Sequence, residues 1–346
     1  MPSMTHGRTP AGRSSAFRMC GRALGTLSSI VVVAAGIATL VLASREAASQ
    51  GFPDRTVKLI VGVAPGASSD LMARVLAEAL EFKLGQRVIV ENRAGADGII
   101  AVGHVASAPP DGYTLLFGFG SQFAINPVLY AKLPYDPERD LAPVSLVALQ
   151  SWALAVHPSV PVTSAIALAD YSRAHPGTLS YGAGTSTFML GAESFKQRTG
   201  ADMLHVPFNG SAPVVTALVG GTVQVGITTA FDLLANEIAG KVRTLAVSGS
   251  KRFPAFPDVP TFAELGLGDD VPVWTAVFAP AGTPPGVVGR LNAAIVSVLN
   301  EPSVRTKFES AGQTVVGSTP EELAARAARD RERMGALVKR IGLPLR

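Results

Sequence analysis

The feature that most constrains the fold of this sequence is an alternation between short apolar runs and longer segments with a helical period. Residues 57–62 are apolar except for Lys58 and partly β-branched, and residues 70–84 repeat apolar side chains at helical spacing. The same order returns over residues 88–91, 96–107 and 114–117, which predicts a βαβαβ unit. Because such units form mostly parallel sheets covered by helices, we expect an α/β protein.

A second unit of the same kind follows Pro143, where a long apolar stretch covers residues 144–156. The remaining elements are expected as strands at 180–182, 204–207, 223–228, 243–248 and 277–279, and as helices at 164–174, 188–198, 213–219, 231–239, 285–299, 302–311 and 320–341. Two α/β units in one chain favour a ligand cleft between them, bordered by the loops that follow strands.

The first fifty residues have a different character from the rest of the chain. Four arginines between positions 8 and 22 precede an uncharged apolar run over residues 23–43, and the small residues 47–49 follow. This order is typical of a secretory signal peptide. We therefore expect residues 1–49 to be a signal peptide, cleaved near Ser49, and the protein to be periplasmic. An uncleaved membrane anchor is the alternative, since about 20 apolar residues span a bilayer.

The net charge of +4 comes entirely from this leader. The chain carries 30 basic and 26 acidic side chains, and five arginines and one glutamate of these fall within residues 1–49. The remainder has 25 of each sign, which gives no indication of nucleic-acid binding. The single cysteine, Cys20, also lies in the leader, so an exported chain would depend on core burial and not on disulfides.

The first loop that could hold a ligand is residues 64–70, between the first expected strand and helix. Its side chains are small, and the amino end of a helix offers free amides and a dipole that favour an anion. Ser68 and Ser69 add hydroxyl donors. The same residues could equally serve only to cap the helix.

Three other loops follow expected strands. Residues 181–187 and 118–123 each resemble half of a dinucleotide-binding Gly-x-Gly-x-x-Gly motif but lack its third glycine, so neither predicts a nucleotide cofactor. Residues 206–213 contain Asn209-Gly210, a tight-turn pair. Asn209 could donate to a carboxylate or serve only the turn.

Sequence patterns of common catalytic and metal sites are missing. There is no Gly-x-Ser-x-Gly elbow, P-loop or His-Glu-x-x-His helix, and His104, His157, His175 and His205 are scattered. We therefore expect no enzyme, no catalytic residue, no metal and no cofactor. A hydrolase assembled from distant residues stays open.

A set of short segments carries a resemblance over about residues 52–322. The segments are 52–55 (FPDR), 57–61 (VKLIV), 64–66 (APG), 90–95 (VENRAG), 110–116 (PDGYTLL), 125–127 (INP), 133–136 (LPYD), 210–213 (GSAP), 257–261 (PDVPT) and 279–284 (APAGTP). In this order and spacing they resemble the tripartite tricarboxylate transporter substrate-binding proteins, also called Bug receptors.

The resemblance implies a periplasmic binding protein fold of type II, in which the chain crosses twice between two lobes that border the ligand cleft. It implies one lobe of residues 51–150 plus 250–346 and a second of residues 151–249. Members hold a carboxylate with amides and hydroxyls of the first strand-to-helix loop, partly through waters. The implied role is capture of a small mono- or dicarboxylate for delivery to membrane permease subunits. A sensor that presents its closed form to a signalling partner is one alternative, and a secreted hydrolase is the other.

The sequence departs from this family at several positions in the expected site. Ala67 replaces a second glycine, Met189 a histidine, Asn209 a lysine and Thr228 an aspartate. Because the last two changes remove one fixed charge of each sign, we expect a less charged site. The residues expected to bind the ligand are Gly66, Ala67, Ser68, Ser69, Asp70, Ser121, Gln122, Gly184, Thr185, Ser186, Thr187, Phe208, Asn209, Thr228 and Thr229.

Overall fold

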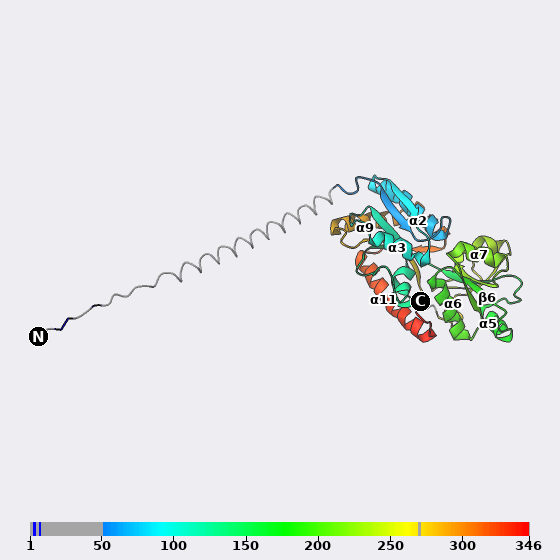
Figure 1. The fold of residues 1–346 in the computed structure, drawn as a ribbon. Helices are drawn as coiled ribbons and strands as arrows, with labels where there is room; N and C mark the ends of the chain where they lie inside the picture. Colours follow the sequence, from blue (N-terminus) through cyan, green and yellow to red (C-terminus); the bar gives the residue numbers. More distant parts are fainter. Residues whose placement is uncertain (1–2, 5–6, 8–50, 269–270, 346) are drawn as a thin grey trace. The chain divides into compact units, whose positions relative to one another are not determined.

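Two separate β-sheets form the framework of the protein (Figure 1). The structure is a computed structural model, and it describes residues 3–4, 7, 51–268 and 271–345. The apolar run of the predicted signal peptide and its cleavage point near Ser49 lie outside the described residues. Residues 53–346 form one compact unit. Within the described part, none of the helices combines the length and the apolarity that a membrane crossing needs.

The first sheet has the strand order β11-β4-β10-β3-β1-β2. β2, β1 and β3 are parallel, whereas β10 runs antiparallel to β3 and β4, and β11 antiparallel to β4. β1 is buried at four of its five positions because it is a central strand in contact with α2 and α3. The strands are β1 (Val57–Val61), β2 (Val88–Asn92), β3 (Thr114–Phe119), β4 (Leu141–Gln150), β10 (Val273–Pro280) and β11 (Gln313–Val315).

Helices from both ends of the chain pack on this sheet, and we call the sheet with these helices the first lobe. α2 and α3 contact the parallel strands, and α9 and α11 contact β4. The helices and helical turns are α2 (Ser68–Leu84), η1 (Ala96–Gly98), α3 (Ile99–Ala106), η2 (Ser121–Ile125), α4 (Asn126–Leu129), α9 (Pro285–Leu299), α10 (Pro302–Ser310) and α11 (Pro320–Ile341).

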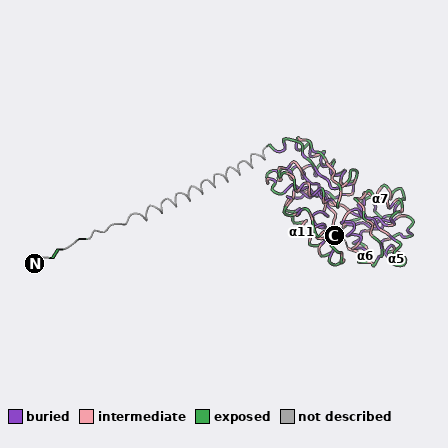
Figure 2. The backbone as a smooth tube through the Cα atoms, in the orientation of Figure 1, coloured by how far each residue is buried: buried purple, intermediate pink, exposed green. Residues whose placement is uncertain are grey.

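The second sheet has the order β7-β6-β8-β5-β9, and with its helices it forms the second lobe. β7, β6 and β8 are parallel, and β5 is antiparallel to β8 and β9. Its elements are β5 (Trp152–Val156), α5 (Ala165–Ala174), β6 (Ser180–Ala183), α6 (Ser186–Thr199), β7 (Leu204–Pro207), α7 (Ser211–Val219), β8 (Val225–Thr229), α8 (Ala230–Ile238) and β9 (Arg243–Val247). Figure 2 shows buried residues in the interior of the folded part and exposed residues along its outside.

The chain passes between the sheets twice, from β4 to β5 through Ser151 and from β9 to β10. The predicted α/β fold of two lobes with two crossings is therefore confirmed. A buried apolar cluster joins Ile125 and Leu129 to Trp152 of the second sheet and to Leu337 of α11. The residue ranges that we predicted for the lobes, 51–150 plus 250–346 and 151–249, stay a proposal.

Two segments near the loops differ from the predicted elements. The helix expected over residues 96–107 is split, because Ala96 and Asp97 have positive φ angles of 47° and 53° and only α3 continues. The first residue of α4 supports this turn: the Asn126 side-chain amide donates to the Asp97 carbonyl oxygen (3.3 Å). η2, α4 and the short strand β11 have no counterpart among the predicted elements.

Candidate ligand-binding site

Two adjoining cavities lie between the first and second lobes. Both are lined by Val63 and Phe119 of the first lobe and by Thr185 and Gly210 of the second. They enclose about 400 and 510 Å³ of empty space, counting the part open to solvent, so only a small ligand fits between the lobes. We call the smaller one the Asp97 cavity and the larger one the Thr275 cavity, each after a residue that lines it.

The amino end of α2 borders the Thr275 cavity. Ala67, Ser68 and Ser69 line the cavity there. Ala67 is the N-cap residue, and its side chain cannot accept a hydrogen bond from the first-turn amides. An anion in the cavity would therefore meet backbone amides and the positive end of the helix dipole.

Asp70 holds the loop before α2 from the inside. Its carboxylate is 1% exposed and accepts hydrogen bonds from the Gly66 amide (2.9 Å), the Asn92 side chain (2.8 Å) and two guanidinium nitrogens of Arg74 (both 3.1 Å). Gly66 has a φ of 87°, which only glycine adopts readily. These contacts hold the loop in the shape that places Ala67 to Ser69 against the cavity.

Asp70 is expected to contribute stability at neutral pH that is lost in acid. Burial would raise the pKa of its carboxyl, but hydrogen bonds from Arg74, Gly66 and Asn92 and the positive charge of Arg74 outweigh burial and hold the pKa below 3.8. Since the folded-state pKa is the lower one, the stabilisation is complete above the unfolded-state pKa and is lost as pH falls through the folded-state pKa.

Urea unfolding of the wild type and of Asp70→Asn from about pH 7 down to about pH 2.5 measures this contribution. The difference in unfolding free energy between the two should be constant near neutrality and shrink below pH 3.8. A difference that persisted unchanged at the lowest pH would contradict a stabilising Asp70 carboxylate.

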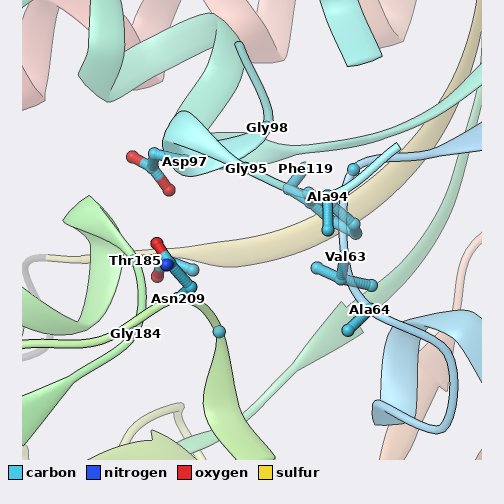
Figure 3. Close-up of a pocket in the computed structure, with 12 residues that line it drawn as sticks. Val63, Ala64, Ala94, Gly95, Asp97, Gly98, Phe119, Gly184, Thr185 and Asn209 are labelled. Atoms are coloured by element: carbon cyan, nitrogen blue, oxygen red, sulfur yellow. The ribbon is translucent and has the colours of Figure 1, made fainter. Parts of the chain in front are cut away.

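The amino end of α6 meets a carboxylate of the first lobe. The Oδ2 atom of Asp97 accepts a hydrogen bond from the Ser186 amide (3.2 Å), and the Ser186 hydroxyl donates to Oδ1 of Asn126 (3.0 Å). Figure 3 shows Asp97 pointing toward Thr185 and Asn209. The positive φ of Asp97 therefore directs its carboxylate across the lobe boundary.

The loops of the second lobe approach each other closely in the wall of the Asp97 cavity. The Gly210 amide donates to the Gly184 carbonyl oxygen (3.0 Å). A Cβ atom on Gly184 would lie 2.1 Å from the Gly210 carbonyl oxygen, closer than any side chain can approach. Glycine at position 184 is therefore required for this contact.

Asp232 at the start of α8 lies behind the Thr275 cavity. The Thr229 hydroxyl caps α8 by accepting from the Asp232 amide (3.2 Å), and the Thr228 hydroxyl donates to Oδ2 of Asp232 (3.5 Å). Burial raises the pKa of the Asp232 carboxyl and outweighs the hydrogen bonds from Thr229, Ser211 and Ser68, which lower it. Those three residues line the cavity, and Ser68 belongs to the opposite lobe.

Some buried polar atoms at the Thr275 cavity have no hydrogen-bond partner among the described residues. They are the hydroxyl oxygens of Thr275 and Thr185 and the side-chain nitrogen of Gln150. Thr275 is 1% exposed. Because a buried polar group without a partner is costly, these atoms are available to hydrogen-bond a polar group or a water in the cavity.

The sequence-predicted residues fall into two sets. Those that line a cavity are Ala67, Ser68, Ser69, Ser121, Gly184, Thr185, Thr187, Asn209 and Thr229. Those that line neither cavity are Gly66, Asp70, Gln122, Ser186, Phe208 and Thr228. The second set bonds or packs within the protein; the Gln122 side chain, for example, accepts from the Phe119 amide (3.0 Å), and Phe208 packs against the second-lobe core.

The structure also brings in residues that the sequence did not indicate. Thr275 and Trp274 come from the first half of β10, and Gln150 from the end of β4. A polar residue inside an apolar strand carries no local sign of function. In the sequence, Asp97 is a single carboxylate near the start of an expected helix, where capping is a sufficient explanation.

A comparison with protein families identifies the chain. A model described as tripartite tricarboxylate transporter family receptor matches residues 72–343. The chain belongs to this family. The resemblance inferred from the short segments is thereby confirmed, and the protein is a solute-binding receptor of a periplasmic transport family.

Relatives of this receptor extend over most of its length. Protein BugT of Bordetella pertussis is 37% identical over 322 residues, which is 92% of this chain and 97% of BugT. Rpa4515 of R. palustris, solved with adipate, is 34% identical with a TM-score of 0.82 and covers 85% of this chain and 100% of its own. MatC from Rhodopseudomonas palustris, solved with malate, is 33% identical with a TM-score of 0.78 and covers 83% and 100%.

Proposed function

We propose that this receptor captures a small mono- or dicarboxylate between its lobes and delivers it to membrane permease subunits of a tripartite tricarboxylate-type transporter. The observation that carries the proposal is the amino end of α2, where Ala67, Ser68 and Ser69 present small side chains and backbone amides to a cavity that both lobes enclose. The adipate bound to Rpa4515 and the malate bound to MatC support a carboxylate as the ligand class.

The cavity-lining members of the predicted set are proposed as ligand contacts. Ser69 and Thr187 approach the Thr275 cavity from opposite lobes, and Gly184 and Asn209 close the Asp97 cavity from the second lobe. The remaining predicted residues support these walls: Asp70 shapes the loop before α2, and Ser186 bonds to Asp97 across the lobes.

The family match favours the receptor over the signalling and hydrolase alternatives. A serine nucleophile needs a general base within hydrogen-bond reach. The Ser186 hydroxyl donates to Asn126, and among the described residues no histidine lines either cavity. These contacts suit binding and give no support to acyl transfer.

Ser69→Leu tests the proposed wall. The larger side chain would fill the space at the amino end of α2, so we expect at least about a tenfold loss of carboxylate affinity. Isothermal calorimetry of the purified protein with a panel of organic acids measures it. At a hundredfold excess over Kd, a ligand of the wild type should add about 2.7 kcal/mol to the unfolding free energy.

Lys83→Leu is the matched control, since it adds the same side chain to the exposed last turn of the same helix. It should bind as the wild type does. Equal affinities of Ser69→Leu and the wild type would show that this wall does not contact the ligand. If no organic acid binds the wild type, the proposed function itself is wrong.

A further inference from the structure

The carboxylate of Asp232, in the second lobe, is bonded to the amino end of α2 in the first lobe. Ser68 donates to it from both its backbone amide and its side-chain hydroxyl, and Ser211 and Thr229 donate from their hydroxyls. Ser68, Ser211 and Thr229 all line the Thr275 cavity. A carboxylate of the protein therefore already uses donors that the proposed function offers to a carboxylate of the ligand.

The shared donors bring the two carboxylates close together. A ligand carboxylate at the amino end of α2 and the carboxylate of Asp232 would both lie within hydrogen-bond reach of Ser68. Two carboxylates that share a site do not both stay ionised, because the repulsion between like charges raises the pKa of one of them until it keeps a proton. The cavity is therefore expected to bind a carboxylate best when Asp232 is neutral.

The contacts of Asp232 suit a neutral carboxyl as well as a charged one. Burial raises the pKa of this carboxyl above its ordinary value, against the hydrogen bonds from Thr229, Ser211 and Ser68, which lower it. The Thr228 hydroxyl lies 3.5 Å from Oδ2 of Asp232. Because a hydroxyl can accept a hydrogen bond as well as donate one, these groups can also bond to the O–H of a protonated Asp232.

The charged groups on the elements around Asp232 are engaged elsewhere. α7, β5 and β8, which contact α8, carry no titratable side chain. Glu237 of α8 accepts hydrogen bonds from β9, Arg243 of β9 donates to a backbone carbonyl, and Arg74 of α2 pairs with Asp70. No lysine, arginine or histidine of the described residues lines the Thr275 cavity. Within this part of the chain, a proton on Asp232 is therefore what can offset a second negative charge.

Thr275 provides the ligand with a donor that Asp232 does not use. Its hydroxyl lines the same cavity, and the residue is 1% exposed. This hydroxyl has no hydrogen-bond partner among the described residues, so it is available to donate to a ligand carboxylate. The cavity therefore offers a carboxylate more than the donors that it would share with Asp232.

We propose that the receptor binds its carboxylate together with one proton from the solvent, which forms an O–H bond on Asp232 at the amino end of α2. This inference rests on the proposed function and adds the protonation state in which the site works. The ligand carboxylate is a like charge, so the pKa of Asp232 is higher in the complex than in the free protein. Affinity is therefore highest below the pKa of the free protein and falls as pH rises from there to the pKa of the complex.

Calorimetry of the wild type and Asp232→Asn tests the inference, with the tightest binder among lactate, succinate, malate and adipate. Asparagine keeps the shape of the side chain and an acceptor oxygen but carries no charge. At about pH 7.5 the variant should bind this acid at least about tenfold more tightly than the wild type. The ratio of the two affinities should shrink as pH falls to about 5. Ionisation of the ligand itself affects both proteins equally and cancels in the ratio.

A second measurement needs no variant. Wild-type titrations across about pH 5 to 9, each made in two buffers of different ionisation enthalpy, count the protons that enter with the ligand. We expect uptake of up to about one proton for each ligand bound. Binding without proton uptake at any pH in this range would overturn the inference, even if Asp232→Asn did not fold.

Asp258→Asn controls for the loss of one negative charge, because Asp258 is exposed and lines neither cavity. It should bind as the wild type does at every pH. Equal affinities of Asp232→Asn and the wild type across the range, or a ratio that does not change with pH, would overturn this inference and leave the proposed function standing. If no organic acid binds the wild type, the proposed function fails and this inference fails with it.

Discussion

Trp274→Ala is expected to lower the free energy of unfolding by about 3–5 kcal/mol, the range for removing a buried tryptophan. Trp274 is fully buried, and its ring packs against Phe123 with centroids 6.0 Å apart. Its indole nitrogen donates to Oδ2 of the buried Asp330 (2.9 Å), which links β10 to α11. The substitution removes this packing and leaves the carboxylate without the indole donor.

Urea unfolding of wild type and variant measures the effect. Phe82→Ala is the matched control, because it also removes an aromatic ring, but one that is 86% exposed, and it should change stability by about 0.5 kcal/mol or less. Since Trp274 also lines the Thr275 cavity, ligand affinity should fall in the same variant. A stability loss below about 1 kcal/mol would mean that the surrounding core closes the gap completely.

Gly184→Ala is expected to reduce ligand affinity more than tenfold. Its Cβ would lie 2.1 Å from the Gly210 carbonyl oxygen, so the two loops that wall the Asp97 cavity have to separate. Because the conflict is with backbone and not with a flexible side chain, we also expect a loss of about 1–3 kcal/mol in stability.

Gly103→Ala in α3 controls for the general effect of glycine replacement, since a Cβ there meets nothing within 4 Å. It should stabilise the protein by about 0.4–1 kcal/mol through the unfolded state. Calorimetry measures the ligand affinity of both variants, and urea unfolding measures their stability. Wild-type affinity in Gly184→Ala would show that the approach of the two loops is not needed for binding.

Most helices and strands were predictable because they depend on interactions between residues that are close in the sequence. The helices at 285–299 and 320–341 were expected with the bounds that the structure has, because proline at the start and apolar periodicity are local signals. α11 also begins with a capping box between Thr319 and Glu322. By contrast, the predicted helix over 96–107 failed at Asp97, where a hydrogen bond from Asn126 of α4 holds a left-handed turn.

The candidate site was predictable only in part, because local signals place a residue in a loop but do not determine which contacts it makes. Ser68, Ser69 and Gly184 stand in loops that follow strands, so the rule for α/β proteins places them at the cleft. Asp70 has the same position in the chain but lies inside its own loop, because Arg74 and Asn92 hold its carboxylate there. Spacing along the chain does not distinguish a residue that faces the cavity from one that supports it.

The sequence by itself determined that this is a two-lobed α/β protein with small-residue loops at the cleft and, through its family motifs, a receptor of the tripartite tricarboxylate transporter family. Only the tertiary structure decided which polar groups meet there. Thr275 pairs with Phe119 across β10 and β3, and Asp97 reaches Ser186 across the lobes. These contacts join residues far apart in the chain. Their geometry follows from sheet register and lobe packing, which local periodicity does not encode.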